Sequence, residues 1–275
     1  MKAIKWVGKG VNGIGLVLVV LLFALPFLWM MSTSVKTLGE TITFPPTWLP
    51  EVWMWENFTT AWNSGPFLKY FMNSIIVAVG ILVFQFLTMI PAAYAFARYE
   101  FKGKGFFFAL TMVTLMIPAQ LIFLPVYLQM SSFGLLDTVW ALILPFGSSA
   151  FGIFLLRQSF KQVPEELLEA ARLDQASEWK IILRIMMPMS KPVLITFALF
   201  SFITHWNDYF WPLVMTTSDS ARTLPLGIAK LKEVEGGVAW NILMAGNMIL
   251  VVPILIVFFF AQRHIIRAFV YTGVK

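Results

Sequence analysis

Six long apolar stretches, separated by shorter segments that carry nearly all of the charge, dominate the hydropathy pattern of the chain. They span residues 13–35, 70–97, 105–130, 138–156, 192–215 and 238–262. An α-helix needs roughly 17 to 25 residues to cross the hydrocarbon core of a bilayer, so each stretch is long enough. The pattern predicts an all-α integral membrane protein with six transmembrane helices. Because no strong tandem repeat or low-complexity linker interrupts it, one transmembrane domain is expected over residues 1–275.

The distribution of lysine and arginine predicts the orientation. If the N-terminus is cytoplasmic, the segments on that side hold 15 of the 20 basic residues, in agreement with the positive-inside bias. These are Lys2, Lys5, Lys9, Arg98, Lys102, Lys104, Arg157, Lys161, Arg172, Lys180, Arg184, Lys191, Arg263, Arg267 and Lys275. Both termini are therefore expected in the cytoplasm. The first apolar stretch is longer than a normal secretory signal and has no convincing cleavage site, so it is expected to be retained.

Composition agrees with a bilayer environment. With 59% hydrophobic and 12% charged residues, the chain has more apolar surface than a soluble core of this size can bury. The formal charge of +6 follows from the topology, because the basic residues do not cluster on an exposed polar surface as nucleic-acid binding requires. Membrane lipid is thus an expected partner, and nucleic acid is not.

The chain offers no expected site for ATP hydrolysis or for a metal. It has no cysteine, and His205 and His264 are far apart in the sequence, so no thiolate or histidine metal site is predicted. A phosphate-binding loop needs Gly-x4-Gly-Lys-Ser/Thr, because backbone N–H groups cradle the phosphates while lysine and the hydroxyl handle charge and magnesium. The nearest segment, Gly103-Lys104-Gly105, lacks the hydroxyl and the spacing. We expect no catalytic residue, metal or cofactor in this chain.

The longest predicted inside loop, residues 157–191, has the pattern of two short helices. Pro164 suits the first position of a helix, and the two glutamates that follow place negative charge at its positive end. Ser177 is suited to cap a second helix, whose apolar residues repeat at helical spacing and which Pro188 is expected to end. The pattern predicts helix, turn, helix at the inner face of the membrane.

Two interpretations of this loop stay open on physical grounds. An amphipathic pair of helices lying on the membrane surface explains the pattern with solvated charges. A docking surface explains it equally well, because the small Ala170 and Ala171 side chains beside the Glu169 carboxylate let another protein approach closely while the charge sets the register.

The same segment resembles the EAA loop of ABC importer permeases. That loop reads Glu-Ala-Ala, three residues, Gly, nine residues, Ile-x-Leu-Pro, and Glu169-Ala170-Ala171 and Ile185-Met186-Met187-Pro188 stand at this spacing. Gln175 occupies the position where the family usually has glycine, a residue that allows a sharp turn. Met187 replaces the usual leucine, which is a mild apolar exchange.

The resemblance extends over nearly the whole chain and is closest to the carbohydrate-uptake, maltose-type permeases. It is carried in order by Phe44-Pro45-Pro46 with Trp48 and Pro50, Tyr70 with Asn73-Ser74, Ile117-Pro118 with Pro125, Trp206-Asn207, Pro212-Leu213, Thr223-Leu224-Pro225, Trp240-Asn241 with Met244-Ala245, and Gly273-Val274-Lys275. Each match alone is weak, and their shared order makes them specific.

Membership of that family implies a type I ABC importer permease fold in the inner or cell membrane of a bacterium or archaeon. It implies three partners: a dimer of ATP-binding-cassette ATPases, which would use ATP and Mg²⁺, a second homologous permease, and an extracellular solute-binding protein. The resemblance also implies that the 157–191 loop couples ATP hydrolysis to transport. Its expected contacts with the ATPase are Glu169, Ala170, Ala171, Asp174, Gln175, Ala176 and Ser177, and Gly273, Val274 and Lys275 are further candidates.

The expected solute is a mono- or oligosaccharide, with glycerol 3-phosphate or a polyol as the alternative. Trp206, Asn207 and Asp208 are candidates for lining or gating its pathway, because aromatic rings, an amide and a carboxylate suit sugar recognition; packing explains them equally well. Asn73, Gln85, Gln120 and Gln129 could line a polar path, although hydrogen bonding between helices is the commoner use of such residues.

Two rival classes have weaker support. A proton-coupled secondary transporter would use His205 and Asp208 as a relay, but more polar residues in several spans would be expected. An intramembrane serine protease would pair Ser149 with His205, since a nucleophile needs a base within reach.

Overall fold

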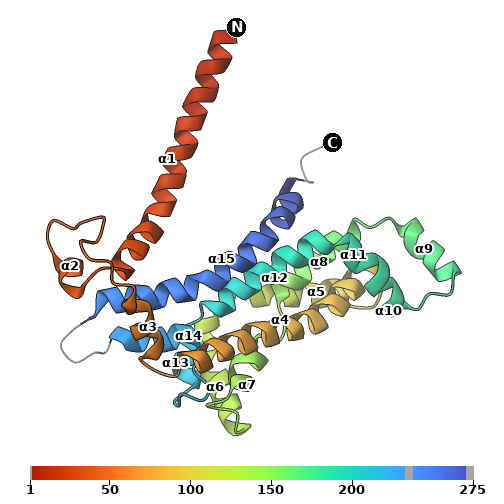
Figure 1. The fold of residues 1–275 in the computed structure, drawn as a ribbon. Coiled ribbons are helices and arrows are strands. Elements are labelled where there is room, and N and C mark those ends of the chain that lie inside the picture. Colours follow the sequence, from red (N-terminus) through yellow and green to blue (C-terminus); the bar gives the residue numbers. More distant parts are fainter. Residues whose placement is uncertain (1, 233–237, 271–275) are drawn as a thin grey trace. The chain divides into compact units, whose positions relative to one another are not determined.

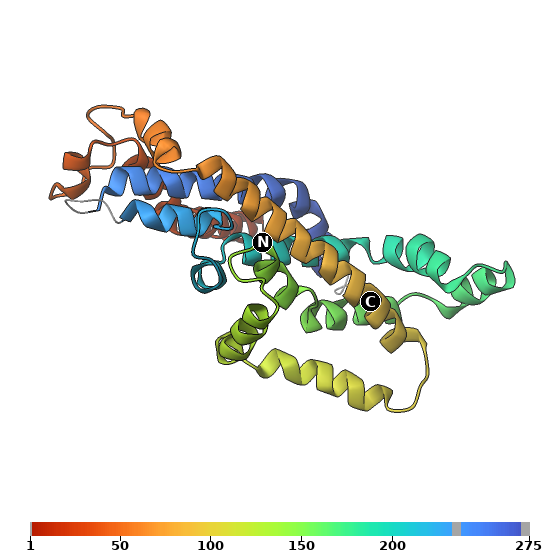
Figure 2. The same cartoon turned by 90° about the horizontal axis from the view of Figure 1, so that it is seen from below.

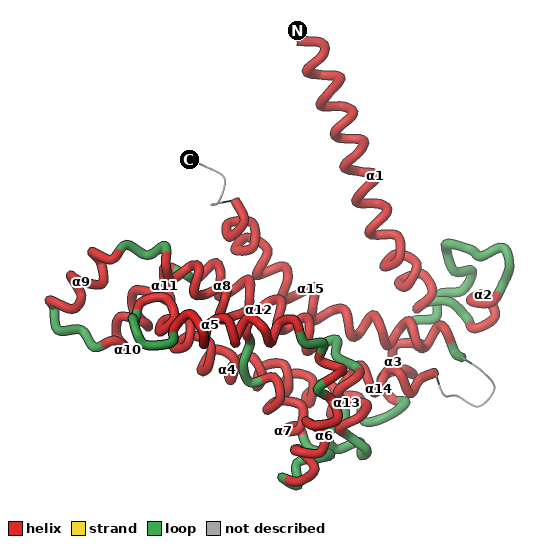
Figure 3. The backbone as a smooth tube through the Cα atoms, turned by 180° about the vertical axis from the view of Figure 1, so that it is seen from behind, coloured by secondary structure: helices red, strands yellow, loops and turns green. Residues whose placement is uncertain are grey.

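The computed structural model describes the backbone of residues 2–232 and 238–270, and the side chains of residues 15–232 and 238–263. Every regular element in these residues is a helix (Figures 1 and 3). The chain separates into two contact units, one made of Met1–Phe67 and Gly227–Pro253 and the other of Leu68–Leu226 and Ile254–Lys275. The all-α prediction is confirmed for the described residues, while the single transmembrane domain over 1–275 stays a prediction.

The first unit joins its helices through buried amides. Its elements are α1 (Lys2–Ser34), α2 (Leu38–Ile42), α3 (Glu56–Asn63), η5 (Lys230–Lys232) and the first half of α15 (Trp240–Val270). The Asn57 amide donates to the backbone carbonyls of Ser34 and Lys36 at 3.0 and 2.8 Å. Asn241 in turn donates to the Asn57 side-chain oxygen at 3.1 Å. These bonds satisfy carbonyls at the end of α1 that have no partner within the helix, so α1, α3 and α15 are held together there.

The second unit contains the second to fifth segments predicted to span the membrane, the end of the sixth, and the 157–191 loop. Its elements are α4 (Phe67–Arg98), α5 (Lys104–Val113), η1 (Thr114–Met116), η2 (Ala119–Leu121), α6 (Phe123–Ser132), α7 (Val139–Ile143), η3 (Leu144–Phe146), α8 (Ala150–Lys161), α9 (Glu165–Leu173), α10 (Glu178–Ile181), η4 (Ile182–Met186), α11 (Met187–Met189), α12 (Lys191–Trp206) and α13 (Phe210–Met215), while α14 (Leu224–Ala229) crosses into the first unit. Figures 1 and 2 show α9 and α10 projecting beyond the end of α4 that carries Arg98.

Three of the six predicted spans are continuous apolar helices in the described residues: Gly15–Ser34, Phe67–Arg98 and Trp240–Arg263. Two further candidates are bent pairs, Val139–Phe146 with Ala150–Lys161 at 44° and Glu178–Met189 with Lys191–Trp206 at 81°. By length and composition the described chain therefore has three spans, or five if each bent pair is one span. The count of six and the cytoplasmic termini stay predictions.

The third, fourth and fifth predicted spans differ from the expectation because each is broken, the fourth between Phe146 and Ala150. In the third, helix stops before Ile117 and resumes in short turns, since Pro118 has no N–H to donate and its ring disfavours helix in the preceding residue. In the fifth, α12 ends at Trp206 and α13 begins at Phe210. An apolar stretch of 20 residues therefore does not by itself predict an unbroken helix.

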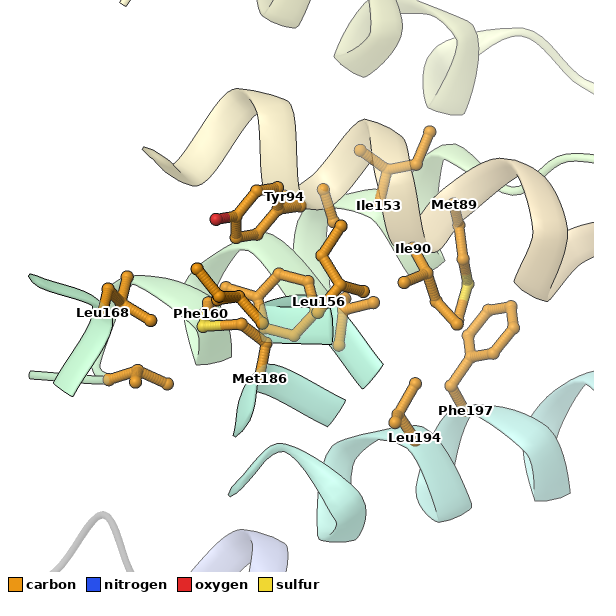
Figure 4. Close-up of a cluster of buried hydrophobic side chains, with 14 residues drawn as sticks. Met89, Ile90, Tyr94, Ile153, Leu156, Phe160, Leu168, Met186, Leu194 and Phe197 are labelled. Carbon is orange, nitrogen blue, oxygen red and sulfur yellow. The ribbon is translucent and has the colours of Figure 1, made fainter. Parts of the chain in front are cut away.

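Helices α4, α8 and α12 approach one another closely at Gly152 of α8. A Cβ added there would lie 2.6 Å from the Met89 sulfur and 2.7 Å from a ring carbon of Phe197, so only glycine fits. Around this contact, buried side chains of these helices and of α9 to η4 form one hydrophobic cluster (Figure 4). The cluster extends from the predicted spans into the loop between them.

Candidate functional site

The two helices predicted in the 157–191 loop are present, and we refer to residues 165–181 as the hairpin. Helix α9 begins at Glu165, directly after Pro164, whose extended backbone makes it the capping residue rather than the first helical residue that the sequence suggested. Leu168 on α9 is fully buried in the cluster, whereas Leu167 and Leu173 are 45% and 83% exposed. One row of α9 therefore anchors the hairpin and the rest of its surface stays open.

The turn after α9 forms despite the glutamine at the position where the resembling family has glycine. Gln175 adopts the left-handed conformation, with φ of 56°. The N–H of Ala176 bonds to the carbonyl of Ala171, and that of Gln175 to the carbonyl of Arg172, each at 3.0 Å. This is the hydrogen-bond pattern of a Schellman helix end, in which a non-glycine residue bears a conformational cost of about 1 kcal/mol.

Ser177 caps the second helix, as predicted. Its hydroxyl accepts the Lys180 N–H, and α10 begins at the next residue, Glu178. The prediction that Pro188 ends this helix is wrong, because helix continues through Met189. The turn before it is π-helical, with the Met187 N–H bonded to the carbonyl of Ile182, and this wider turn accommodates a proline that has no N–H.

The base of the hairpin belongs to the hydrophobic cluster. Leu168 of α9, Ile181 at the end of α10 and Met186 of η4 are each fully buried. Figure 4 shows Leu168 and Met186 gathered with Phe160 of α8 and Tyr94 of α4. Since buried side chains of this size typically contribute about 1.5–3 kcal/mol each, the hairpin moves as part of α4 and α8 rather than as a free loop.

A chain of charged groups also ties the hairpin to the end of α4. Arg98 lies 2.6 Å from Glu165, and its guanidinium donates to the backbone carbonyls of Phe160 and Val163. The second carboxylate oxygen of Glu165 lies 3.3 Å from Arg172. The Glu165 carboxylate therefore joins α4 to α9.

The chain continues into α10 through Glu178. Arg172 lies 3.1 Å from one oxygen of Glu178, and the Tyr94 hydroxyl of α4 donates to the other. Burial opposes ionisation of Glu178, but the hydrogen bonds from Tyr94 and Arg172 outweigh it and lower its pKa. The hydrogen bond to Glu178 raises the pKa of the Arg172 guanidinium. Both pKa shifts favour the charged forms of Arg172 and Glu178.

The sequence did not predict Tyr94, Arg98 and Glu178 as functional residues. In the sequence, Arg98 is one basic residue among many at a predicted inner helix end. The Arg98–Glu165 pair joins positions 67 residues apart, and the Tyr94–Glu178 hydrogen bond joins positions 84 residues apart. No local spacing encodes such contacts. The sequence did predict the face of α9 that carries Glu169. It could not predict which residues of other helices pair with the carboxylates near that face.

Glu169 and Ala170 lie on the open surface of the hairpin, together with Asp174 and Ser177. Among the described residues the Glu169 carboxylate makes no hydrogen bond or ion pair, in contrast to Glu165 and Glu178. Ala171 and Ala176 are partly buried and pack on the cluster. The Glu-Ala-Ala step thus presents an unpaired carboxylate and a small side chain outward, while its third residue faces the protein.

Trp206, Asn207 and Asp208 form the break between α12 and α13. Trp206 is 1% exposed and stacks on Phe202 with ring centroids 5.3 Å apart. The Asn207 amide donates to the Ile203 carbonyl at 2.8 Å, and the Asp208 carboxylate accepts the Trp211 N–H at 3.3 Å. These local bonds close the two helix ends, and the role of the three residues in a pathway stays a prediction. Gly273, Val274 and Lys275 lie outside the described residues.

Two further quoted motifs meet in the second unit. The Asn73 amide donates to the carbonyls of Ser220 and Arg222, both at 2.9 Å. The Ser74 hydroxyl accepts the Leu224 N–H at 2.8 Å. The start of α4 thus holds the segment that leads into α14, which gives Asn73-Ser74 and Thr223-Leu224-Pro225 a shared structural role.

Comparison with known proteins gives consistent results. The family model described as "Binding-protein-dependent transport system inner membrane component" matches residues 89–271. The chain is 36% identical to the probable ABC transporter permease protein YurM of Bacillus subtilis, over 98% of this chain and 90% of that protein. It is 36% identical to the arabinooligosaccharides transport system permease protein AraQ of Halalkalibacterium halodurans, over 89% and 86%. It is also 33% identical to the sn-glycerol-3-phosphate transport system permease protein UgpE of Yersinia pestis, over 84% and 85%.

A solved structure shares the fold. The chain superposes with a TM-score of 0.84 on a chain of a bacterial ABC transporter involved in the import of the acidic polysaccharide alginate, covering 95% of this chain and 97% of that one at 24% identity. A chain of the MetNI methionine ABC transporter matches less closely, with a TM-score of 0.54 over 73% of this chain. The helical arrangement is therefore that of an ABC importer permease.

Proposed function

The chain belongs to the family of binding-protein-dependent transport system inner membrane components, and from this premise we propose that it forms part of the pathway by which an ABC importer takes up a sugar. As a member of that family it is a multi-pass membrane permease subunit and not itself an enzyme. Membership of this family argues against the two rival classes considered from the sequence, an intramembrane serine protease and a proton-coupled secondary transporter. The topology we propose is six spans in one domain with both termini in the cytoplasm, supported by the positive-inside distribution.

The proposed solute is a mono- or oligosaccharide. AraQ is named for arabinooligosaccharide transport, and a relative from Streptomyces coelicolor that is 33% identical is named for diacetylchitobiose uptake. UgpE supports glycerol 3-phosphate as a second candidate. The saccharide comes first because two relatives with different sugars match over more than 85% of this chain.

The proposed partners are a dimer of ATP-binding-cassette ATPases, a second homologous permease and an extracellular solute-binding protein. ATP and Mg²⁺ would be bound by the ATPase, not by this chain. One related structure is an alginate transporter in complex with a periplasmic protein that holds an alginate pentasaccharide, which supports the binding protein as a partner.

The proposed coupling mechanism is supported by the difference between the two sides of the hairpin. Its base is held by Leu168 and by the Arg98–Glu165 pair, while Glu169 and Ala170 face outward with no partner in the described chain. A surface that is rigidly connected on one side and open on the other can transmit a displacement. We therefore assign ATPase contact to the outward-facing Glu169, Ala170, Asp174, Gln175 and Ser177, with the partly buried Ala171 and Ala176 at the edge of this surface. We assign pathway lining or gating to Trp206, Asn207 and Asp208.

The first experiment identifies the assembly. Mass spectrometry of the proteins that co-purify with the tagged chain from its native membrane should recover an ATPase, a second permease and a binding protein in stoichiometric amounts. Repeated recovery of the chain alone under mild extraction would overturn the importer assignment.

A charge reversal then tests the coupling surface. Glu169→Lys should lower ATP-driven solute uptake by roughly tenfold or more, because like charges at a docking site cost several kcal/mol, while the amount of folded chain stays unchanged. Glu166→Lys makes the same change of net charge on an exposed glutamate of the same helix and should have a smaller effect. Wild-type uptake by Glu169→Lys would refute the coupling role.

A further inference from the structure

A groove of about 310 Å³ lies in the second unit, between α4, α8 and α12. Five side chains that line it are polar: Gln85, Ser149, Ser201, Thr204 and His205. Three phenylalanines complete the lining, Phe151, Phe197 and Phe200, of which the first and last are 44% and 49% exposed. None of these residues belongs to the hairpin or to the Trp206–Asp208 segment.

The Gln85 side chain leaves a hydrogen-bond donor facing this groove. Gln85 is 4% exposed, and its amide oxygen accepts the Ser201 hydroxyl at 2.6 Å. Its NH2 group makes no hydrogen bond within the described chain, and it is not among the fully buried polar atoms that lack a partner there, so it is open to the groove that Gln85 lines. Because the oxygen is held by Ser201, the NH2 group is the part of Gln85 available to an occupant of the groove.

Other donors and acceptors around the groove are also open. The Ser149 oxygen accepts the Gly152 N–H at 3.1 Å, which leaves the hydroxyl proton available. The His205 ring lies beside Phe146 with centroids 4.8 Å apart, and no hydrogen bond from the imidazole is found among the described residues. Ser149 and His205 therefore line one groove without forming the bonded pair that a serine nucleophile needs.

The position of the groove in the predicted spans makes a donor without a partner difficult to explain by helix packing alone. Gln85 is 13 residues from Arg98, so it lies about 20 Å along α4 from that end at a rise of 1.5 Å per residue. With the Arg98 end of α4 at the inner membrane surface, as the positive-inside distribution predicts, Gln85 and its partner Ser201 lie well inside a hydrocarbon core about 30 Å thick. A polar group without a partner at this depth is costly and points to a function.

The chemistry of the lining selects the class of occupant. No lysine, arginine, aspartate or glutamate is among the eight lining residues. Neutral donors and acceptors between aromatic rings suit the hydroxyls and C–H faces of a sugar, whereas a phosphate is usually held by arginine or lysine. The volume is at the lower end of the ~300–1,000 Å³ found for small-molecule sites, so one sugar unit fits better than a long oligosaccharide.

We propose that this groove is a saccharide subsite on the present chain, in which the Gln85 amide, held by Ser201, donates to a hydroxyl of an uncharged sugar unit during import. The proposal rests on the proposed function and narrows it, since it favours a neutral saccharide over glycerol 3-phosphate. A side chain of the second permease or a lipid tail would be the competing occupant of the groove.

The absence of cysteine from the chain allows a direct test in the assembled importer, with all co-purified subunits in proteoliposomes. Thr204→Cys and Ser149→Cys place a thiol in the groove, and Ser132→Cys places one on an exposed residue outside the predicted spans as a control. The rate of alkylation by a water-soluble maleimide is measured with ATP and vanadate, in the presence of an arabino-oligosaccharide, diacetylchitobiose or sn-glycerol 3-phosphate.

The proposal expects both groove thiols to react and to be protected at least threefold by the saccharide that the wild-type importer takes up. Glycerol 3-phosphate should not protect them, and no solute should change the reaction at Ser132→Cys. Groove thiols that do not react, as a partner side chain or lipid would cause, or that react at one rate with every solute, would overturn the subsite. Wild-type uptake of the three solutes is measured separately, so an importer that takes up no saccharide refutes the proposed function instead.

A second variant tests the donor itself. Gln85→Met keeps the length of the side chain and removes the amide, and should raise the solute concentration needed for half-maximal import about tenfold, as loss of one hydrogen bond does. Asn247→Leu is the matched control: it likewise keeps the length of the side chain and removes an amide, and among the described residues that amide bonds only to the Leu243 carbonyl of its own helix, at 2.9 Å. Equal import by the two variants, at equal amounts of assembled complex, would overturn the role of Gln85.

Discussion

The two parts of α4 treat polar side chains in opposite ways. Near its end, Tyr94 and Arg98 are paired with the Glu178 and Glu165 carboxylates of the hairpin, and Arg98 also donates to the carbonyls of Phe160 and Val163, although its Nε has no partner in the described chain. Near its middle, Gln85 accepts a hydrogen bond from Ser201, and its NH2 group makes none among the described residues. The pairs at the end hold α4 against the hairpin, whereas the Gln85 NH2 group is open to an occupant of the groove. The polar residues near the end of α4 thus connect it to the hairpin, whereas we propose that Gln85 near its middle binds the solute.

The largest effect expected at the connected end is loss of the buried anchor. Leu168→Ala should destabilise docking of α9 by about 2–5 kcal/mol, because it leaves a cavity in the cluster. Hydrogen exchange of backbone amides over residues 165–181 in the purified complex measures this. Leu167→Ala, at a neighbouring position that is 45% exposed, should cost less than about 1 kcal/mol. Similar exchange in both variants would mean that the cluster does not hold the hairpin.

A smaller effect is expected when the charged chain is interrupted. Glu178→Gln removes the charge that joins Arg172 to Tyr94 and should destabilise the hairpin by about 1 kcal/mol, a value limited by solvent screening since both side chains of the pair are more than a third exposed.

The pKa of Glu178 also predicts how the stability of the hairpin changes with pH. The folded pKa of Glu178 is lowered from 4.5, so its contribution is fully present above pH 4.5 and is lost as the pH falls through the lower folded value. Hydrogen exchange of the hairpin, corrected for the intrinsic pH dependence, should therefore be independent of pH between 5 and 7 and increase in more acidic buffer. Glu178→Gln should reduce this acid sensitivity. An unchanged acid response in the variant would assign it to another carboxylate.

The smallest effect expected is a gain in stability. Gln175→Gly should stabilise the turn between α9 and α10 by about 0.5–1 kcal/mol, because glycine adopts the left-handed conformation without steric cost. Gln175→Ala retains the cost and should give no gain. Limited proteolysis at residues 173–177 measures both variants, and faster cleavage of Gln175→Gly would show that flexibility outweighs the relief of strain.

Much of the hairpin could be predicted because its signals are local. The Ser177 cap, the two acidic residues at the start of α9 and the helical spacing of apolar residues each act within a few positions. The continuous helices Gly15–Ser34, Phe67–Arg98 and Trp240–Arg263 follow from length and hydropathy in the same way. The breaks at Pro118 and after Trp206 were missed, because an apolar stretch is compatible with a broken helix wherever neighbouring helices satisfy the freed backbone groups.

The sequence by itself determined that the chain is helical, apolar enough for a membrane, and equipped with a charged loop of two short helices. Only the tertiary structure decided which charges in that loop are paired and which are open, and that Gln85 meets Ser201 across 116 residues. Hydropathy and capping depend on neighbours in the chain, so they can be read along it. Hydrogen-bond partners between helices depend on which faces pack together, and that is decided by close contacts such as the one at Gly152.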